Sequence, residues 1–93
     1  MKSFDDVWQI IVEQEGSEFQ QVRGKIFTYQ TVGNAITPST TNYIISRSQL
    51  EKAWKRMPVN GPGEFQDLIG PSYLFAILTD PRIPQKTQTL MDE

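Results

Sequence analysis

The side chains that most often carry catalysis are scarce in this chain of 93 residues. Histidine and cysteine are both absent, so the chain has no imidazole base near neutral pH and no thiol nucleophile. Ser48 and Lys52 are four residues apart, as a serine nucleophile and a lysine base could be. No glycine-rich oxyanion loop accompanies this pair. We therefore predict that the protein is not an enzyme and has no catalytic residue.

Metal and cofactor chemistry is equally sparse. Asp5 and Asp6 are adjacent carboxylates, as are Asp92 and Glu93, but neither pair is followed by oxygen ligands at calcium-loop spacing. The glycine-rich turn at residues 60–63 lacks the Lys-Ser/Thr sequence of a phosphate-binding loop. We expect neither a metal site nor a cofactor.

Charge is distributed unevenly along the chain. Residues 1–22, 23–57 and 58–93 carry net charges of −4, +5 and −3, which sum to the −2 of the whole chain. The candidate basic binding patch comprises Arg23, Lys25, Arg47, Lys52, Lys55 and Arg56. Such a patch could contact nucleic-acid phosphates, helped by hydroxyl groups in the turn at residues 40–42. An isoelectric point near 5.0 counts against a dedicated nucleic-acid binder.

Two functional hypotheses follow from these patterns. The first is a small non-enzymatic adaptor, regulator or inhibitor that binds another protein or a second copy of itself, because acid–base–acid polarity suits electrostatic steering. Its candidate aromatic contacts are Tyr29 and Tyr43, with Trp54 as a further anchor. The alternative is a nucleic-acid-binding accessory domain that uses the basic face of a helix over residues 49–57. We place the protein-interaction hypothesis first because of the charge balance.

Helical periodicity organises the N-terminal residues. Apolar side chains recur at helical spacing: Phe4, Val7, Trp8 and Ile11. This pattern predicts a helix over residues 4–15, which Gly16 ends as a left-handed cap.

Residues 18–46 have the composition of strands, with β-branched and aromatic residues punctuated by glycine and asparagine. Gly33 and Asn34 predict a two-residue hairpin turn between a strand over residues 25–32 and one that begins at Ala35. A further strand is expected over residues 43–46. Residues 18–23 are expected to add another, with Gly24 as a bend.

Within the strand at residues 25–32, Phe27 and Tyr29 fall on one face, and Ile26 and Val32 fall on the other. Either both faces are partly covered, or one face exposes aromatic rings for binding. We favour covered faces, because large aromatic side chains are usually buried.

Residues 48–57 predict an amphipathic helix. Ser48 as N-cap and Glu51 form the Ser-x-x-Glu capping box, and Pro58 ends the helix. Its apolar stripe is Leu50, Ala53, Trp54 and Met57. Lys52, Lys55 and Arg56 project on the opposite side.

Residues 73–78 form the longest apolar run in the chain. Pro71 in a first turn and Pro81 just beyond the run favour a helix, which must be covered on several sides because it is apolar all round. We expect this helix at the centre of the fold. Residues 64–69 predict one or two helical turns whose apolar side chains point inward: Phe65, Leu68 and Ile69.

Several of these segments resemble a pattern found in small uncharacterised prokaryotic proteins. The resemblance rests on the hairpin, on residues 45–53, and on a Gly-Pro-Ser-Tyr sequence that leads through Ala-Ile-Leu to Asp-x-Arg-Ile at residues 70–83. It covers about two-thirds of the chain and implies no activity.

The sequence thus predicts a single compact α+β domain over residues 1–84. It comprises an N-terminal helix, a small antiparallel sheet of about three strands, and two or three short C-terminal helices. Residues 85–93 are expected to be a flexible C-terminal tail. With neither a signal-peptide core nor a run of membrane-spanning length, we expect a cytoplasmic protein without membrane contact.

Overall fold

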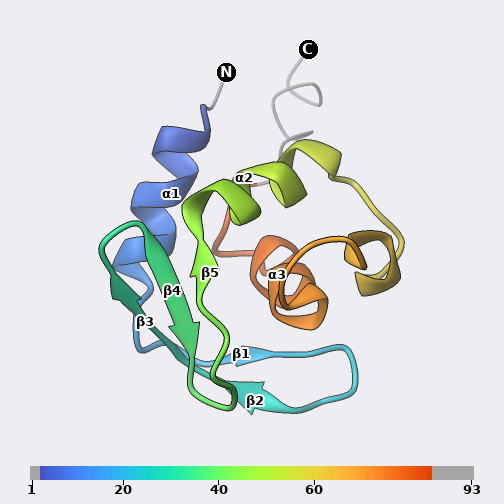
Figure 1. Ribbon diagram of the computed structural model, residues 1–93, viewed down its shortest axis with the longest axis horizontal. Helices are drawn as coiled ribbons and strands as arrows, with labels where there is room; N and C mark the ends of the chain where they lie inside the picture. The colour runs from blue at the N-terminus through green and yellow to red at the C-terminus, as the bar shows by residue number, and fades with distance from the viewer. Residues whose placement is uncertain (1–2, 85–93) are drawn as a thin grey trace.

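The computed structural model describes residues 3–84, and the predicted tail at residues 85–93 lies outside them. Within the described residues, the fold is the expected α+β arrangement of an N-terminal helix, antiparallel strands and later short helices (Figure 1). The helices are α1 (Phe4–Glu13), α2 (Arg47–Arg56), the 3₁₀ helix η1 (Pro62–Phe65) and α3 (Pro71–Leu78). The strands are β1 (Phe19–Gln20), β2 (Ile26–Phe27), β3 (Tyr29–Val32), β4 (Ala35–Pro38) and β5 (Ile45–Ser46).

The strands form two small antiparallel sheets, β1–β2 and β3–β4–β5. The single strand predicted over residues 25–32 is broken at Thr28, whose backbone N–H donates to Ser39 Oγ at 3.1 Å. The Ser39 N–H donates back to the Thr28 carbonyl at 2.8 Å. The chain therefore changes partner at Thr28, from β1 to β4.

The predicted Gly33-Asn34 hairpin is confirmed, with Val32 opposite Ala35 and Gly33 at a φ of +60°. Phe27 and Tyr29 are each only 1% exposed, so the aromatic face is covered, as expected. Our expectation was wrong for the opposite face, where Ile26 and Val32 are 48% and 67% exposed.

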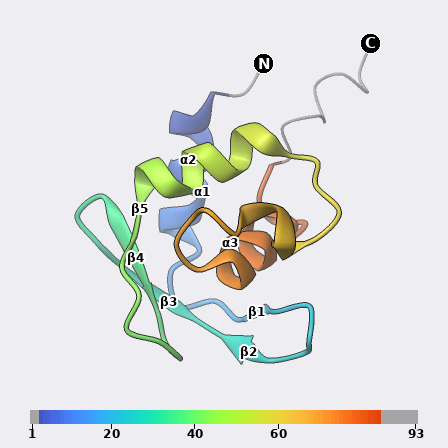
Figure 2. The same cartoon turned by 45° about the vertical axis from the view of Figure 1, so that its right-hand side comes forward.

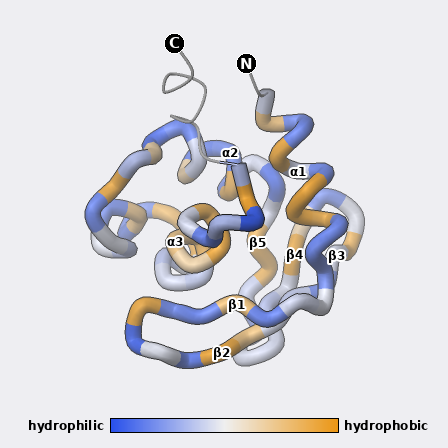
Figure 3. Tube along the Cα trace, turned by 180° about the vertical axis from the view of Figure 1, so that it is seen from behind, coloured by the Kyte–Doolittle hydropathy of each residue, from blue (hydrophilic) through white to orange (hydrophobic). Residues whose placement is uncertain are grey.

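Helix α3 is the predicted centre of the fold. It packs against η1, α2 and β1, and it is hydrophobic over most of its length (Figure 3). Most of its side chains are buried: Tyr73, Leu74, Ala76, Ile77 and Leu78. In the segment before it, Phe65 and Leu68 point inward as predicted, but Ile69 is 44% exposed.

Helix α2 begins two residues earlier than predicted. Its N-cap is Ser46, whose Oγ accepts a hydrogen bond from the Gln49 N–H at 3.3 Å. Strand β5 runs directly into the helix, so the serine that ends the strand caps the helix. Ser48 lies within the first turn, with its Oγ 2.9 Å from that of Ser46, and the predicted capping box with Glu51 is wrong.

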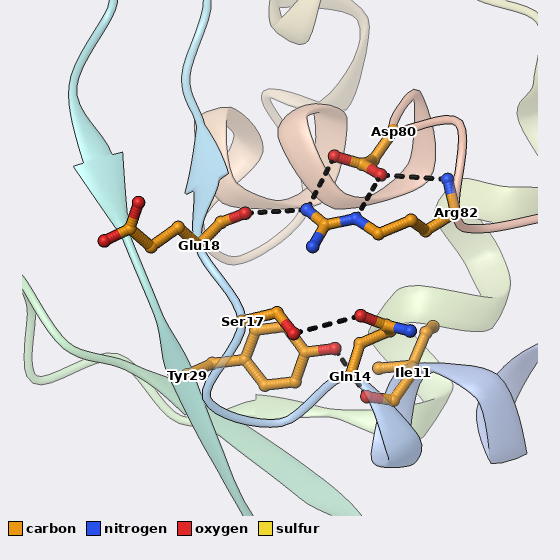
Figure 4. Close-up of polar contacts among 7 residues, drawn as sticks. All are labelled: Ile11, Gln14, Ser17, Glu18, Tyr29, Asp80 and Arg82. Carbon is orange, nitrogen blue, oxygen red and sulfur yellow. Dashed lines mark hydrogen bonds and ion pairs between the residues drawn. The ribbon is translucent and has the colours of Figure 1, made fainter.

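Polar contacts hold the last described residues against the rest of the fold (Figure 4). Arg82 pairs with Asp80 at 2.8 Å, donates to the Glu18 carbonyl at 2.6 Å, and lies 4.3 Å from the centroid of the Phe19 ring. Ile83 is 1% exposed. These contacts hold the end of the described chain against β1.

The Tyr29 hydroxyl fixes the sheet to α1 in the same region. It donates to the Ile11 carbonyl at 2.5 Å, and burial raises the pKa of Tyr29 far above its usual value (Figure 4). Burial thus favours the protonated hydroxyl, which acts as a donor to the last turns of the helix.

Gly70 is a point of close approach between elements. It caps α3 with a φ of +65°, and a Cβ added there would lie 3.0 Å from Ile45 Cδ1 and 3.3 Å from Tyr43 Cδ2. Gly33 has a similar φ of +60° but nothing within 4 Å of an added Cβ. Both glycines therefore need the left-handed backbone conformation, but only Gly70 lacks room for a side chain.

We expect Gly33→Ala to lower the free energy of unfolding by about 1–2 kcal/mol through left-handed strain. Gly70→Ala should cost about 1 kcal/mol more, because the methyl group also crowds the neighbouring side chains. Urea unfolding of both variants measures the difference. Equal losses at the two positions would contradict the close packing around Gly70.

Candidate functional site

A groove lies between the β1–β2 turn and the start of α3. It consists of two adjoining hollows of 270 and 470 Å³ that share Gln21, Pro71 and Ser72. Residues 40–43 close the first hollow, and η1 borders the second. We call the surface formed by residues 21–25, 40–43 and 70–73 the hairpin groove. Figure 1 shows the β1–β2 hairpin on one side of α3 and α2 on the other.

A tight turn shapes the first wall. The Gln21 N–H donates to the Lys25 carbonyl at 2.9 Å, and the Gly24 N–H donates to the Gln21 carbonyl at 2.8 Å. Gly24 adopts a φ of +95°, which a side chain would disfavour. The turn presents Val22, 67% exposed, and Arg23 at its tip.

The second wall is fixed to α3 by side-chain contacts. Thr40 Oγ1 lies 2.7 Å from the Tyr73 hydroxyl, within hydrogen-bond distance. Tyr43 meets Tyr73 edge-on, with ring centroids 6.2 Å apart, and remains 48% exposed. Tyr73 in turn packs edge-on against Phe27 of the core at 4.9 Å. The exposed Tyr43 ring is therefore held in place by buried neighbours.

The groove is positively charged. Arg23 and Lys25 belong to its lining, which contains no carboxylate. Neither residue forms an ion pair with another residue in the range 3–84. Both cations are therefore available to an external ligand.

The predicted basic patch is divided by the fold. Arg23 and Lys25 lie at the hairpin, whereas the other four residues lie on α2, across α3 from it (Figure 1). On α2, Arg47 forms an ion pair with Asp5 and lies 5.7 Å from the Phe4 ring centroid.

Two further cations of α2 also have acidic partners. Lys55 pairs with Glu51 at 3.5 Å. Arg56 binds both carboxylate oxygens of Asp67, at 2.8 and 2.7 Å. Lys52 projects outward, as predicted, without an ion pair to a residue in the described part of the chain. Much of the basic charge of α2 is thus balanced within the molecule.

Two of the predicted aromatic contacts are buried. Tyr29 is 1% exposed because its ring packs against Phe19 and its hydroxyl binds α1, so it cannot serve as a surface anchor. Trp54 is 7% exposed, and its Nε1–H donates to the Pro84 carbonyl at 3.2 Å. Tyr43 is the candidate that the structure leaves accessible.

Sequence reasoning did not single out Gln21, Val22, Pro71 or Ser72 as site residues. The turn at Gly24 was a usable signal for the exposed tip, but the approach of this turn to α3 depends on pairing between β1 and β2. Among residues 3–84, no cluster of three metal-binding side chains is present, and no helix is long and apolar enough to span a bilayer.

No family model, curated protein or solved structure matches the chain.

The Arg56–Asp67 pair gives a test of charge balance on α2. Hydrogen bonds from Arg56 lower the pKa of Asp67 to about 2, from a usual 3.8. Because the folded-state pKa is depressed, the pair stabilises the fold above the unfolded-state pKa, and this stabilisation is lost as pH falls from 3.8 toward 2.

We therefore expect Asp67→Asn to lose less stability than the unmodified protein between pH 5 and pH 2, measured by urea unfolding. Glu18→Gln is the control, because the Glu18 carboxylate makes no ion pair with another residue in the range 3–84. If Asp67→Asn left the pH dependence of the free energy of unfolding unchanged, the result would contradict a stabilising Arg56–Asp67 ion pair.

Proposed function

We propose that this protein is a small non-enzymatic interaction module that binds an acidic segment of a partner protein in the hairpin groove. The observation that carries the proposal is the position of Arg23 and Lys25, two unpaired cations in a groove whose lining has no carboxylate. A ligand with carboxylates is the electrostatic complement of this surface.

The remaining groove side chains suit a peptide. Thr40, Thr41, Gln21 and Ser72 supply hydroxyl and amide groups that can hydrogen-bond an extended backbone. The half-exposed Tyr43 ring supplies an aromatic surface that is already ordered by its contact with Tyr73, which limits the entropy cost of binding. An apolar residue flanked by carboxylates fits this combination.

The contacts also set the expected strength. Arg23 and Lys25 act near the surface, where each ion pair contributes about 0.2–1 kcal/mol and is screened by salt. We therefore expect an affinity that falls as salt concentration rises, with Tyr43 supplying the part that does not depend on salt.

Nucleic-acid binding through α2 is supported less well. Arg47, Lys55 and Arg56 are each paired with a carboxylate, so a phosphate ligand would have to displace these partners. The released carboxylates would then lie close to the nucleic-acid backbone and repel it. A ligand of the hairpin groove would have no carboxylate partner of Arg23 or Lys25 to displace among residues 3–84.

The test measures fluorescence anisotropy of a labelled heptapeptide in which glutamate alternates with leucine. We expect the double variant Arg23→Glu/Lys25→Glu to weaken binding by about tenfold or more, since about 1.4 kcal/mol corresponds to a factor of ten. The matched control is Lys52→Glu/Lys55→Glu, which changes the net charge by the same amount on α2 and should bind the peptide nearly as well as the unmodified protein.

A short mixed-sequence DNA duplex is titrated in parallel at low salt. If the two double variants lost peptide binding equally, the loss would follow from the net charge alone. That result would contradict peptide binding in the hairpin groove. Duplex binding that only the α2 variant abolishes, without peptide binding by the unmodified protein, would favour the nucleic-acid hypothesis.

A further inference from the structure

The asparagines of the chain are Asn34, Asn42 and Asn60, and all three are exposed. Asn60 is the one that precedes a glycine, Gly61. Asparagine is thermolabile because the backbone nitrogen of the next residue is tethered close to its side-chain amide carbon and can attack it. The surroundings of each asparagine therefore decide which of them can react.

Asn60 lies between α2 and η1, outside any helix or strand. Figure 2 shows this segment, drawn in yellow, at the right-hand margin of the molecule. The backbone N–H of Asn60 donates to Glu64 Oε2 at 2.8 Å. The Gly61 N–H, by contrast, donates no hydrogen bond to another residue in the range 3–84. The nitrogen that would attack is therefore not held in place by a hydrogen bond.

Gly61 also leaves space around this nitrogen. Its backbone is extended, with a φ of −178°, and no heavy atom beyond the adjacent residues lies within 4 Å of an added Cβ. Because Gly61 has no side chain, its nitrogen can approach Asn60 Cγ with little steric opposition. The pair can therefore reach the reactive geometry while the neighbouring helices stay folded.

The other two asparagines have more constrained neighbours. Ala35, which follows Asn34, belongs to β4 and pairs with strands on both sides. Tyr43, which follows Asn42, packs its ring edge-on against Tyr73, with 6.2 Å between the centroids. Both of these following residues also carry a Cβ, which crowds the attack. The structure thus separates Asn60 from the other two.

We propose that Asn60 and Gly61 form a site of spontaneous deamidation, with water as the second reactant. The Gly61 nitrogen bonds to Asn60 Cγ, the Cγ–Nδ2 bond breaks, and Nδ2 leaves as ammonia with the proton of the Gly61 N–H. Water then opens the resulting succinimide and restores that N–H. Opening at Cγ gives aspartate. Opening at the backbone carbonyl carbon of Asn60 gives isoaspartate, in which the main chain continues through Cγ.

The reaction changes the charge at the start of η1. Both products replace a neutral amide by a carboxylate, which adds one negative charge to the net charge of −2. The new carboxylate falls close to that of Glu64, which binds the Asn60 N–H, and the two repel each other. Pro62, two residues further on, lines the second hollow of the hairpin groove. The modification therefore alters the border of the groove with time, but the proposal does not depend on binding there.

The experiment incubates the full chain in mildly alkaline buffer and follows each asparagine by peptide mapping and mass spectrometry. We expect Asn60 to be converted to a mixture of aspartate and isoaspartate, while Asn34 and Asn42 remain intact. A synthetic peptide of residues 57–63, incubated in parallel, gives the rate for the same sequence without the fold. The folded chain should react within about tenfold of the peptide, a difference in activation free energy below about 1.4 kcal/mol.

Two glycine variants provide the matched comparison. Gly61→Ala and Gly63→Ala each add a Cβ that meets no heavy atom within 4 Å, so both should fold like the unmodified chain, which circular dichroism verifies. Gly61→Ala places a methyl group beside the ring that forms, and it should slow the reaction by about tenfold or more. Gly63→Ala does not touch the reacting atoms and should leave the rate unchanged.

An intact Asn60 after full conversion of the peptide would overturn the proposal, since the fold would then protect the site. Equal rates in Gly61→Ala and the unmodified chain would overturn it too, as would a product without isoaspartate, because either result would exclude the succinimide. Conversion of Asn34 or Asn42 at the rate of Asn60 would contradict the selection of Asn60 by its surroundings.

Discussion

The fold depends on the need to cover α3 on all sides. Leu74, Ile77 and Leu78 are completely buried, and each such side chain contributes about 1.5–3 kcal/mol when it is removed from water. A helix with apolar residues around its whole circumference has no face that can meet solvent. Helix α2, η1 and β1 therefore pack against it from different directions, and Arg82 and Ile83 return the chain to the same core.

The hairpin groove lies at the start of α3, where the surrounding elements no longer cover the helix. Helix α3 begins at Pro71, directly after its N-cap Gly70, whose lack of a side chain lets Ile45 and Tyr43 approach closely. Beside this corner, the β1–β2 turn extends past the helix and carries its cations to the edge of the molecule. The groove is thus a consequence of how the central helix starts, with walls held by core contacts such as Tyr73 on Phe27.

Local signals in the sequence predicted the elements that local interactions determine. The apolar run of α3, the Gly33-Asn34 turn and the amphipathic stripe of α2 each rest on residues close together in the chain. The break in the strand at Thr28 was missed because it depends on Ser39, eleven residues away. The shift of the α2 cap to Ser46 was missed because the extent of β5 decides it.

The division of the basic residues was also beyond local reasoning. A sequence reveals that a segment is basic, but the acidic partners of Arg47 and Arg56 come from other parts of the chain, at Asp5 and Asp67. Folding balances these charges and leaves the hairpin cations without partners among residues 3–84. Helix α2, the more basic segment in the sequence, is therefore less available to an acidic ligand than the two cations of the hairpin.

We have proposed that the hairpin groove, and not α2, binds acidic ligands. The most direct measurement is an NMR titration of the isotopically labelled protein with the unlabelled glutamate–leucine heptapeptide. We expect the amide resonances of Val22, Lys25, Tyr43 and Ser72 to shift in a saturable manner, while those of α2 stay in place. Shifts confined to Lys52, Lys55 and their neighbours on α2 would contradict it.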